Sequence, residues 1–405
     1  MQSRPFDRFS FAFTAACVAM TSVTYGMGRY AYGLFLPSIR QEFNLSTFDL
    51  ALIASLNTAV YLLATVIASG IAIYFRPRTL IVVSGLVTTS GLLIAGLAPS
   101  FPVAAGGIIL AGAGGGILSP AMFEAIEAWL SAGWKGRAIA VVNAGAAPGL
   151  IFTGLAAYWL QASWQQAWIA MAGIGLAVTL WNAWLLPDRR LVQAHAKPKL
   201  PLRPALFLRA ECMPLYLSLF VYGLLFSTYL TFAVDLILST GGMAFPADRL
   251  FWVLLGLAGL PAMFTGRAVS RFGVRGLLAV SMPLCGLSYA LLAMAPGNQA
   301  VVLISAVLFG VSSIAPGNGF LVWGISLFRD RPSAATGAVF VVLSLAIITG
   351  PILVGLLSAR IDLLSFFYGV ALLSVLTIPL FPRRIFGTEE TMAGEPGLPA
   401  GAPGG

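Results

Sequence analysis

The chain has 405 residues, of which 59% are hydrophobic and only 9% are charged, and its formal net charge is +9. A soluble domain averages roughly 25% charged residues, so this composition excludes a soluble globular protein and indicates an integral membrane protein. The three cysteines are scattered and His195 is the only histidine, which argues against a disulfide framework and against a metal or haem site.

The N-terminal sequence MQSRPFDRFSFAF has the basic flank of a secretory signal. No small-residue cleavage site ends the apolar run that follows it, and this run is longer than the hydrophobic region of a signal. We therefore expect an uncleaved first membrane span.

Apolar runs of about 20 residues or more, each long enough to cross a hydrocarbon core of ~30 Å, follow one another along the chain. The sequence predicts twelve transmembrane helices, six on each side of a polar linker. They are expected near residues 10–38, 48–75, 79–98, 101–129, 137–160, 166–186, 212–238, 249–268, 275–295, 299–328, 333–358 and 363–381.

The first span contains the stretch TYGMGRYAYGLFLP, in which Arg29 lies among tyrosines in an otherwise apolar run. Tyr25, Arg29 and Tyr32 have the spacing i, i+4, i+7, which is one face of an α-helix. A charge inside a membrane indicates function by default, and arginine binds a carboxylate through two parallel hydrogen bonds. We predict that this face lines a central cleft and binds an anionic group, with a buried structural cation as the alternative.

Further polar or amphipathic residues occur inside other spans. Each of them alone is more typical of helix–helix packing than of ligand binding. As a set they are expected to line the cleft: Asn57, Tyr61, Asn143, Asn318 and Trp323.

Acidic residues inside the spans suggest gating or proton coupling. Glu124 and Glu127 lie near the cytoplasmic end of span 101–129 and are predicted to form a gate, whereas Glu124 is the alternative proton carrier because burial makes a carboxyl easier to protonate. Asp235, near the outer end of span 212–238, is a second carrier candidate, although a role at an interface is favoured. The basic partners assigned to the gate are Arg76, Arg78, Arg137 and Arg271.

Lysine and arginine gather in alternate loops. If the N-terminus is cytoplasmic, 19 of the 23 basic residues lie inside, Arg40, Arg249 and Arg360 lie outside, and Arg29 lies in the membrane. This distribution predicts that both termini are cytoplasmic. Membrane topology thus explains the positive charge, and nucleic acid is excluded as a partner.

The predicted organisation has four parts. Residues 1–186 and 212–384 form two six-helix bundles. The segment 187–211 is rich in proline and basic residues and is expected to be a flexible cytoplasmic linker. The Gly/Pro-rich segment 385–405 is expected to be a disordered cytoplasmic tail.

The second half of the chain repeats patterns of the first half at an offset of 196 or 197 residues. The copies have the same orientation because six spans separate them, so the two bundles are related by an axis along the membrane normal and enclose a cleft. Tyr222 and Tyr229 are therefore expected to face the cleft as well. The aligned pairs are Tyr25 with Tyr222, Tyr32 with Tyr229, Gly70 with Gly266, and Pro120 with Pro316.

Several motifs are similar to those of the major facilitator superfamily. They are the basic loop GRAVSRFGVRG, the run EAWLSAGWKGRAIAVVNAG and the Gly/Pro-rich stretches NAGAAPGLIFTG and ITGPILVG; the first copy of the basic loop, GIAIYFRPRT, lacks the usual acidic residue. The resemblance covers residues 9–384, and GMGRYAYGLFLPSIRQEF resembles the first helix of the YbfB/YjiJ-type branch. It implies an all-α membrane protein with two pseudo-symmetric six-helix bundles, alternating access and a substrate site at mid-membrane.

We expect a monomeric secondary transporter of the bacterial inner membrane that moves a small organic anion, such as a carboxylate, with a proton as the coupling ion and with no cofactor. A drug efflux pump is the alternative within transport, and it would need membrane-embedded acidic residues around a wide aromatic cleft. A non-transporting sensor and a membrane enzyme are the alternatives from other classes. The sequence shows neither the extra domain of a sensor nor the catalytic residues of an enzyme.

Overall fold

The computed structural model describes residues 8–72, 74–160, 163–188, 209–239, 246–328 and 332–382, and all regular structure in these ranges is helical. The linker prediction for 189–208, with His195, and the tail prediction for 385–405 lie outside the described residues.

The first half of the molecule contains α1 (Arg8–Thr21), the π-helix η1 (Ser22–Tyr30), α2 (Tyr32–Phe43), α3 (Thr47–Ile71), α4 (Pro77–Gly96), α5 (Phe101–Trp129), α6 (Ala132–Asn143), α7 (Ala146–Trp159) and α8 (Trp164–Leu185). The second half contains η3 (Ala210–Cys212), α9 (Met213–Ser239), α10 (Ala247–Gly259), η4 (Leu260–Phe264), α11 (Thr265–Met294), α12 (Gln299–Ser313), α13 (Ala315–Leu327), α14 (Pro332–Leu357), α15 (Leu363–Leu376) and η5 (Ile378–Leu380).

Eleven helical segments among the described residues are long and apolar enough to cross a membrane. The difference from the predicted twelve arises at spans 249–268 and 275–295, which the structure joins into the single 48-residue segment Ala247–Met294. Such a segment would measure about 72 Å if it were straight, more than twice the ~30 Å hydrocarbon core. It is bent at Gly273, whose φ of 70° breaks the helical conformation.

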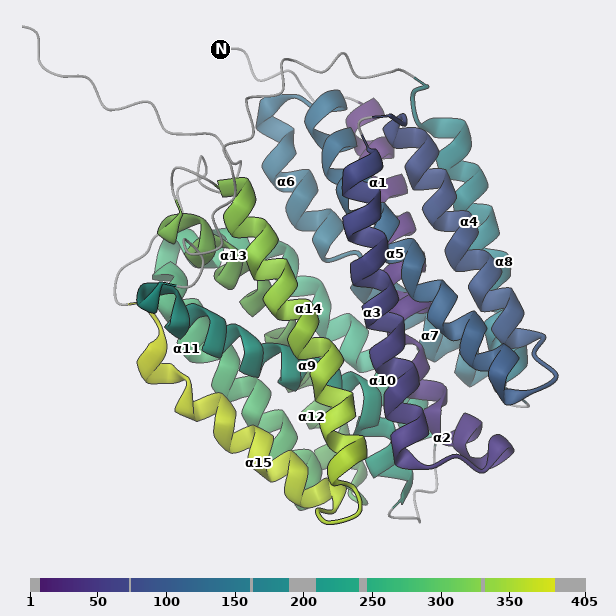
Figure 1. Cartoon of the computed structure of the whole chain (residues 1–405), viewed down its shortest axis with the longest axis vertical. Helices are drawn as coiled ribbons and strands as arrows, with labels where there is room; N and C mark the ends of the chain where they lie inside the picture. Colours follow the sequence, from purple (N-terminus) through teal and green to yellow (C-terminus); the bar gives the residue numbers. More distant parts are fainter. Residues whose placement is uncertain are drawn as a thin grey trace, which may run out of the picture.

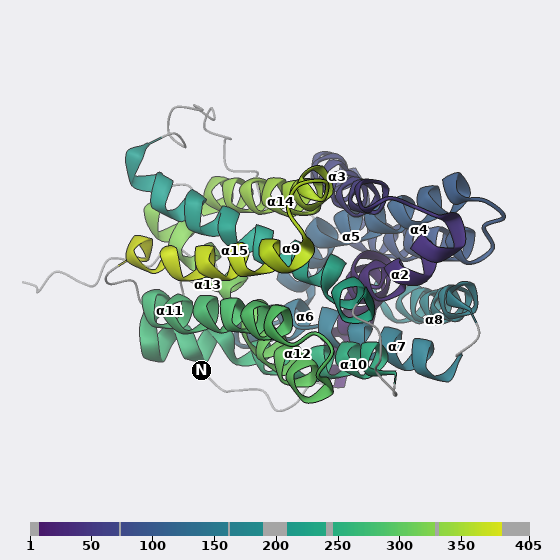
Figure 2. The same ribbon diagram turned by 90° about the horizontal axis from the view of Figure 1, so that it is seen from below.

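The two halves lie side by side. Seen from below in Figure 2, the helices up to α8 are on one side and most of those from α9 onward are on the other. The most extensive contacts between the halves are those of α3 with α14, α7 with α10, and α2 with α9. A seam therefore runs the length of the molecule, between α3 and α14 at the front of Figure 1.

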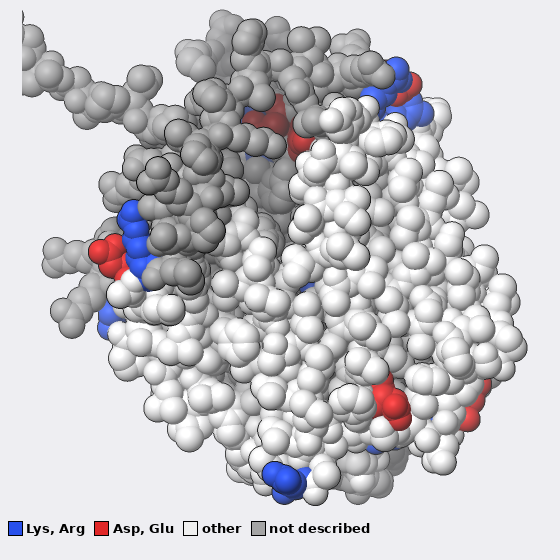
Figure 3. All heavy atoms as spheres, viewed as in Figure 1, with Lys and Arg blue, Asp and Glu red and all other residues white. Residues whose placement is uncertain are grey.

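Charged side chains are sparse on the visible face and gather mostly near its margins (Figure 3). Figure 3 shows a broad uncharged belt, with most of the blue and red atoms near the top, bottom and edges of the view. Large apolar side chains are exposed on the long helices, including Leu63 and Val66 of α3, Leu180 of α8 and Leu372 of α15. A surface of this kind suits a hydrocarbon solvent rather than water.

Candidate functional site

A cavity of about 220 Å³ lies between the two halves, and we call it the central cavity. Arg29 is the only charged residue among the described residues that line it. The polar residues lining it from the first half are Thr21, Tyr25, Arg29, Tyr30, Tyr61, Ser119 and Asn143; those from the second half are Tyr222, Ser313, Asn318 and Ser344.

One end of the cavity, at α2, is closed by contacts between the halves. The Arg40 Nη2 of α2 lies 2.7 Å from the Asp235 Oδ2 of α9. Deeper in, a Cβ atom at Gly33 would overlap the carbonyl oxygen of Leu230, so α2 and α9 approach as closely as their backbones allow. The Ser55 hydroxyl of α3 donates to the carbonyl of Ile348 in α14 at 2.8 Å.

Within the described residues, the other end of the cavity is open. The lining continues along α5 and α6 through Phe123 and Ile126 to Asn143, and the side chains of Phe123 and Asn143 are exposed. The central cavity is therefore accessible from the end at which α5 finishes and α6 begins.

The first span is not one regular α-helix, because nine residues, Ser22–Tyr30, form a π-helix. Three hydroxyls preceding or inside it bond back to carbonyls four residues earlier: Thr21 to Cys17, Ser22 to Val18, and Thr24 to Met20. Such bonds compete with the backbone ladder, and the nearby glycines are poor helix formers. π-Turns are rare and are frequent at functional sites.

The π-helix places Arg29 at the inner end of the cavity. Its side chain is only 9% exposed, and its Nε and Nη2 atoms have no hydrogen-bond partner. The guanidinium carbon lies 4.0 Å from the ring centroid of Tyr61, 5.6 Å from that of Tyr30 and 5.9 Å from that of Tyr25. Within the described ranges, no carboxylate lies within salt-bridge distance of Arg29.

The three tyrosines around Arg29 form a connected aromatic group. The hydroxyls of Tyr25 and Tyr61 are 3.1 Å apart and share a hydrogen bond. The Tyr30 ring packs edge-on against Phe226 of α9, with 5.5 Å between centroids, so this group contacts the second half directly.

The second-half wall opposite Arg29 is mostly apolar. It includes Phe226, Leu230, Phe340, Leu343 and Ile347. The Tyr222 hydroxyl in this wall already donates to the Ser313 carbonyl at 2.7 Å. The cavity is therefore amphipathic, with a cation on one side and hydrocarbon on the other.

Six of the predicted substrate-binding residues line the central cavity and four do not. Those in the lining are Tyr25, Arg29, Tyr61, Asn143, Tyr222 and Asn318. Outside it, Trp323 is buried against Phe320, and the Asn57 amide donates to the Ile108 carbonyl at 2.7 Å, as expected of a residue that joins two helices.

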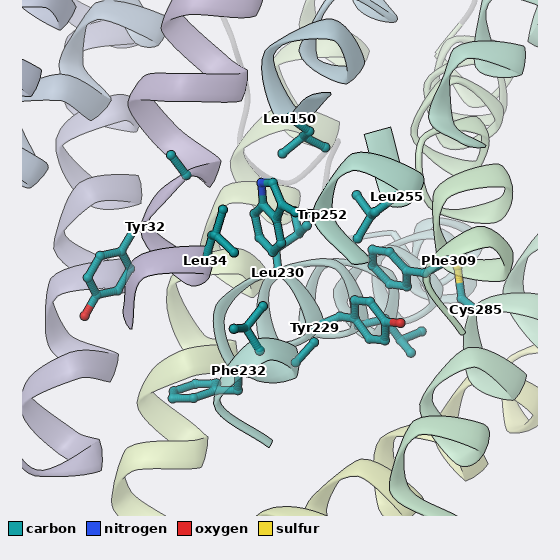
Figure 4. Close-up of a cluster of buried hydrophobic side chains, with 14 of the residues drawn as sticks. Tyr32, Leu34, Leu150, Tyr229, Leu230, Phe232, Trp252, Leu255, Cys285 and Phe309 are labelled. Atoms are coloured by element: carbon teal, nitrogen blue, oxygen red, sulfur yellow. The ribbon is translucent and has the colours of Figure 1, made fainter. Parts of the chain in front are cut away.

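Tyr32 and Tyr229, equivalent positions of the predicted repeat, also lie outside the central cavity. The Tyr32 hydroxyl donates to the Leu50 carbonyl at 3.1 Å, whereas Tyr229 is fully buried and stacks on Phe309 at 3.8 Å (Figure 4). The predicted i, i+4, i+7 face does not persist through the first span because the π-helix changes the number of residues per turn.

The same change explains why the sequence pattern missed Tyr30. An i, i+5 spacing from Tyr25 is off the face of an α-helix but on the face of a π-helix, and Tyr30 lines the cavity next to Arg29. Phe226 was missed because it is apolar, and no sequence signal separates a cavity-facing phenylalanine from one in the core.

The predicted pairing of Glu124 and Glu127 with Arg76, Arg78 or Arg137 does not occur in this structure. Glu127 lies 2.5 Å from the Lys135 Nζ. Glu124 is half-buried, does not line the cavity, and forms no ion pair within the part of the chain that the structure describes.

The arginines assigned to the gate have other contacts. Arg76 lies 2.6 Å from Asp188, and its hydrogen bond holds the pKa of that exposed carboxyl below the usual value. Arg78 donates to the Ala183 carbonyl. Arg137 and Arg271 lie over the neighbouring rings of Trp134 and Phe272. Asp235, by contrast, bonds across the halves to Arg40, which fits the favoured interface role.

Three comparisons with known proteins bear on this geometry. The sequence profile described as Major Facilitator Superfamily matches residues 18–346. The mouse protein "Monocarboxylate transporter 11" is 26% identical over 203 residues, a match that spans 49% of this chain and 44% of that protein.

Two solved structures have a similar fold. A point mutant of the nucleoside transporter NupG superposes with a TM-score of 0.71 at 12% identity, covering 91% of this chain and all of that one. A bacterial homologue of the human lysosomal transporter Spinster, in an inward-facing and unoccupied conformation, has a TM-score of 0.68 at 13% identity, covering 94% of this chain and 95% of that one.

Proposed function

Because the chain belongs to the major facilitator superfamily of membrane transporters, we propose that it moves a small organic monoanion, such as a monocarboxylate, across the bacterial inner membrane by alternating access. The observation that supports this substrate most strongly is Arg29, a buried cation that lines the central cavity with two unpartnered nitrogens.

Magnitudes favour an anionic ligand over a purely structural cation. Leaving a buried charge without its partner costs about 3–5 kcal/mol. A cation–π contact contributes roughly 0.5–2 kcal/mol, and of the three rings only Tyr61 lies close to the guanidinium carbon, at 4.0 Å. A carboxylate that accepts hydrogen bonds from the Nε and Nη2 of Arg29 would supply the negative charge and the acceptor atoms that the rings lack.

The opposite wall supports a substrate with one charge and an apolar body. Phe226, Phe340 and Leu343 offer hydrocarbon, and no second basic residue lines the described cavity to hold a second carboxylate. The volume of about 220 Å³ is smaller than the ~300–1,000 Å³ of typical drug sites, which favours a small solute over a drug. The name of the mouse relative, a monocarboxylate transporter, agrees with this class.

For the membrane arrangement we infer two six-helix bundles with twelve crossings, in which Gly273 separates the eighth from the ninth. The bias of 19 of 23 basic residues toward one side supports cytoplasmic termini. On that topology the open end is cytoplasmic and the closed end, with Arg40 and Asp235, faces outward. The inward-facing conformation of the Spinster homologue is consistent with this orientation.

Alternating access then requires the two ends to open in turn. The outward opening must separate Arg40 from Asp235 and Gly33 from Leu230. For the opposite gate we propose Glu124 and Glu127, which lie on α5 at the open end, with Arg271 of the second half as a partner in the outward-facing state. In that state the local ion pair between Glu127 and Lys135 would be replaced by a pair with Arg271.

A ligand screen tests the proposed function. Melting temperatures of the purified protein would be measured with phenylacetate, benzoate and lactate, with the dicarboxylate succinate, and with the neutral amide and cationic amine analogues of phenylacetate. We expect stabilisation by phenylacetate and benzoate, and none by the amide or the amine. Preferential stabilisation by the amine would instead support the efflux of cations.

A further inference from the structure

We propose that this transporter is an obligatory exchanger, which moves one anion across the membrane only in return for another anion moved the opposite way. The reason is that the protein cannot pass through the state closed at both ends unless an anion is bound to Arg29. The inference rests on the proposed anion site and adds how transport is coupled.

The first observation is that the protein supplies no counter-charge to Arg29. Among the described residues that line the central cavity none is acidic. Of the acidic residues considered for gating or proton coupling, Asp235 is bound to Arg40 at the closed end, Glu127 is bound to Lys135 at the open end, and Glu124 does not line the cavity.

The second observation is the surroundings of the guanidinium. The faces of Tyr25, Tyr30 and Tyr61 attract the cation, but they accept no hydrogen bond from its Nε and Nη2, which remain without partners. In this structure Nε and Nη2 are already buried, and only the remaining exposed part of Arg29, 9% of the residue, can contact water that enters the cavity. In a state closed at both ends that water is excluded, and the full desolvation penalty of an unpaired charge applies.

The charge of the site therefore differs between the empty and loaded carrier. The empty site holds one positive charge and the loaded site holds none, since the carboxylate neutralises Arg29. Closure over the loaded site also buries the apolar body of the ligand against Phe226 and Phe340, whereas closure over the empty site brings the same hydrocarbon toward a bare cation. Only the loaded carrier passes easily between its two orientations.

Proton symport would need a different arrangement. A carboxyl group next to Arg29 would have to pair with it in the empty carrier and accept a proton when the anion binds. Glu124 is the candidate from the sequence, but the cavity lining at its level is formed by Met122, Phe123 and Ile126 instead. The geometry thus favours exchange over proton symport.

The transport test uses the full chain in liposomes, with phenylacetate as the probe. Uptake of labelled phenylacetate would be compared between liposomes filled with unlabelled phenylacetate and liposomes filled with buffer alone. We expect the filled liposomes to take up label at least about tenfold faster, with no acceleration of the buffer-filled ones by an inward proton gradient. Equal rates, or proton-driven uptake into buffer-filled liposomes, would overturn the exchange mechanism while leaving the anion site in place.

A second test uses the empty protein and does not depend on the ligand. Spin labels at Gln41→Cys and Ala359→Cys, exposed positions on the outer end of each half, report outward opening, and the native cysteines are buried. The unliganded protein should show one short distance. Arg29→Met, which removes the charge, and Tyr61→Glu, which places a carboxylate beside Arg29, should each add a longer distance without any anion, whereas the matched Tyr61→Gln should not.

The outcomes separate the two proposals. If phenylacetate fails to bind but Tyr61→Glu and Tyr61→Gln differ as described, the proposed substrate class is wrong. The proposal that the charge of Arg29 prevents closure of the empty protein is then retained. If the unliganded protein already shows both distances, and Arg29→Met and Tyr61→Glu leave them unchanged, the exchange mechanism is wrong. Should Arg29→Met fail to fold, the comparison of Tyr61→Glu with Tyr61→Gln still decides.

Discussion

The opening spans of the two halves, which the predicted repeat makes equivalent, present opposite chemistry to the central cavity. The offset of 197 residues that relates Tyr25 to Tyr222 also relates Arg29 to Phe226. Both members of each pair line the cavity. Yet the first span contains the π-helix Ser22–Tyr30, while α9 is a continuous α-helix over Met213–Ser239.

If the two halves are copies, as the sequence predicts, this difference shows how a duplicated scaffold can form an asymmetric site. A pair of arginines at the two positions would suit a dianion, and a pair of phenylalanines would suit an uncharged ligand. One of each creates a cavity that matches a molecule with a charged end and an apolar end. The irregular span supplies the charge and the regular one supplies the hydrocarbon.

Apart from removal of the Arg29 side chain, the largest effect among substitutions that alter one side of this comparison is expected from Arg29→Lys. Lysine retains the charge but cannot hydrogen-bond a carboxylate through two parallel N–H groups. The affinity for phenylacetate should fall by roughly 10- to 100-fold, equivalent to about 1.5–3 kcal/mol. Isothermal titration of the purified variant measures it, and an unchanged affinity would show that the two-point contact is not used.

A smaller effect is expected from Phe226→Ala on the opposite wall. Loss of the ring removes apolar contact with the body of the ligand, so the affinity for phenylacetate should fall by about tenfold. The affinity for acetate, which has little apolar surface, should change much less. Equal losses for the two anions would mean that Phe226 acts through Tyr30 and Arg29 rather than through the ligand.

The smallest effect on binding is expected from Tyr229→Phe, because this residue lies outside the cavity. The substitution removes the 2.6 Å hydrogen bond with Ser305, which should reduce stability by about 0.5–1.5 kcal/mol. The affinity for phenylacetate should be the same as that of the wild type. A loss of affinity larger than that of Phe226→Ala would show that Tyr229 contributes to the binding site after all.

The fold was readily predicted from the sequence because membrane helices are specified by length and hydropathy, which need no knowledge of contacts. The all-helical membrane architecture and the superfamily are confirmed. The division of Ala247–Met294 into two spans was predicted from its length and its basic residues. In the structure the two helices follow each other without a loop and are separated only by the non-helical backbone of Gly273, so they count as one segment by length.

The sequence predicted site residues only where the residue type alone is unusual inside a membrane span. Arg29 was evident because a cation in hydrocarbon is costly. The prediction placed Tyr32 in the cavity instead of Tyr30 because it assumed an α-helical period. The hydroxyl-to-carbonyl hydrogen bonds that favour a π-helix depend on side-chain rotamers, which the sequence does not specify. The predicted gate pairs are absent from this structure, because several cations lie near Glu127 along the chain and only the folded geometry selects Lys135; their role in another state stays a prediction.

The account depends most directly on whether Arg29 binds the charged group of the substrate. Isothermal titration of phenylacetate into the wild type, Arg29→Ala and the control Arg360→Ala, which removes an exposed arginine far from the cavity, measures this. We predict a loss of affinity of at least about 100-fold for Arg29→Ala and none for Arg360→Ala, with both variants folded. Wild-type affinity in Arg29→Ala would contradict the account and leave Arg29 a structural cation.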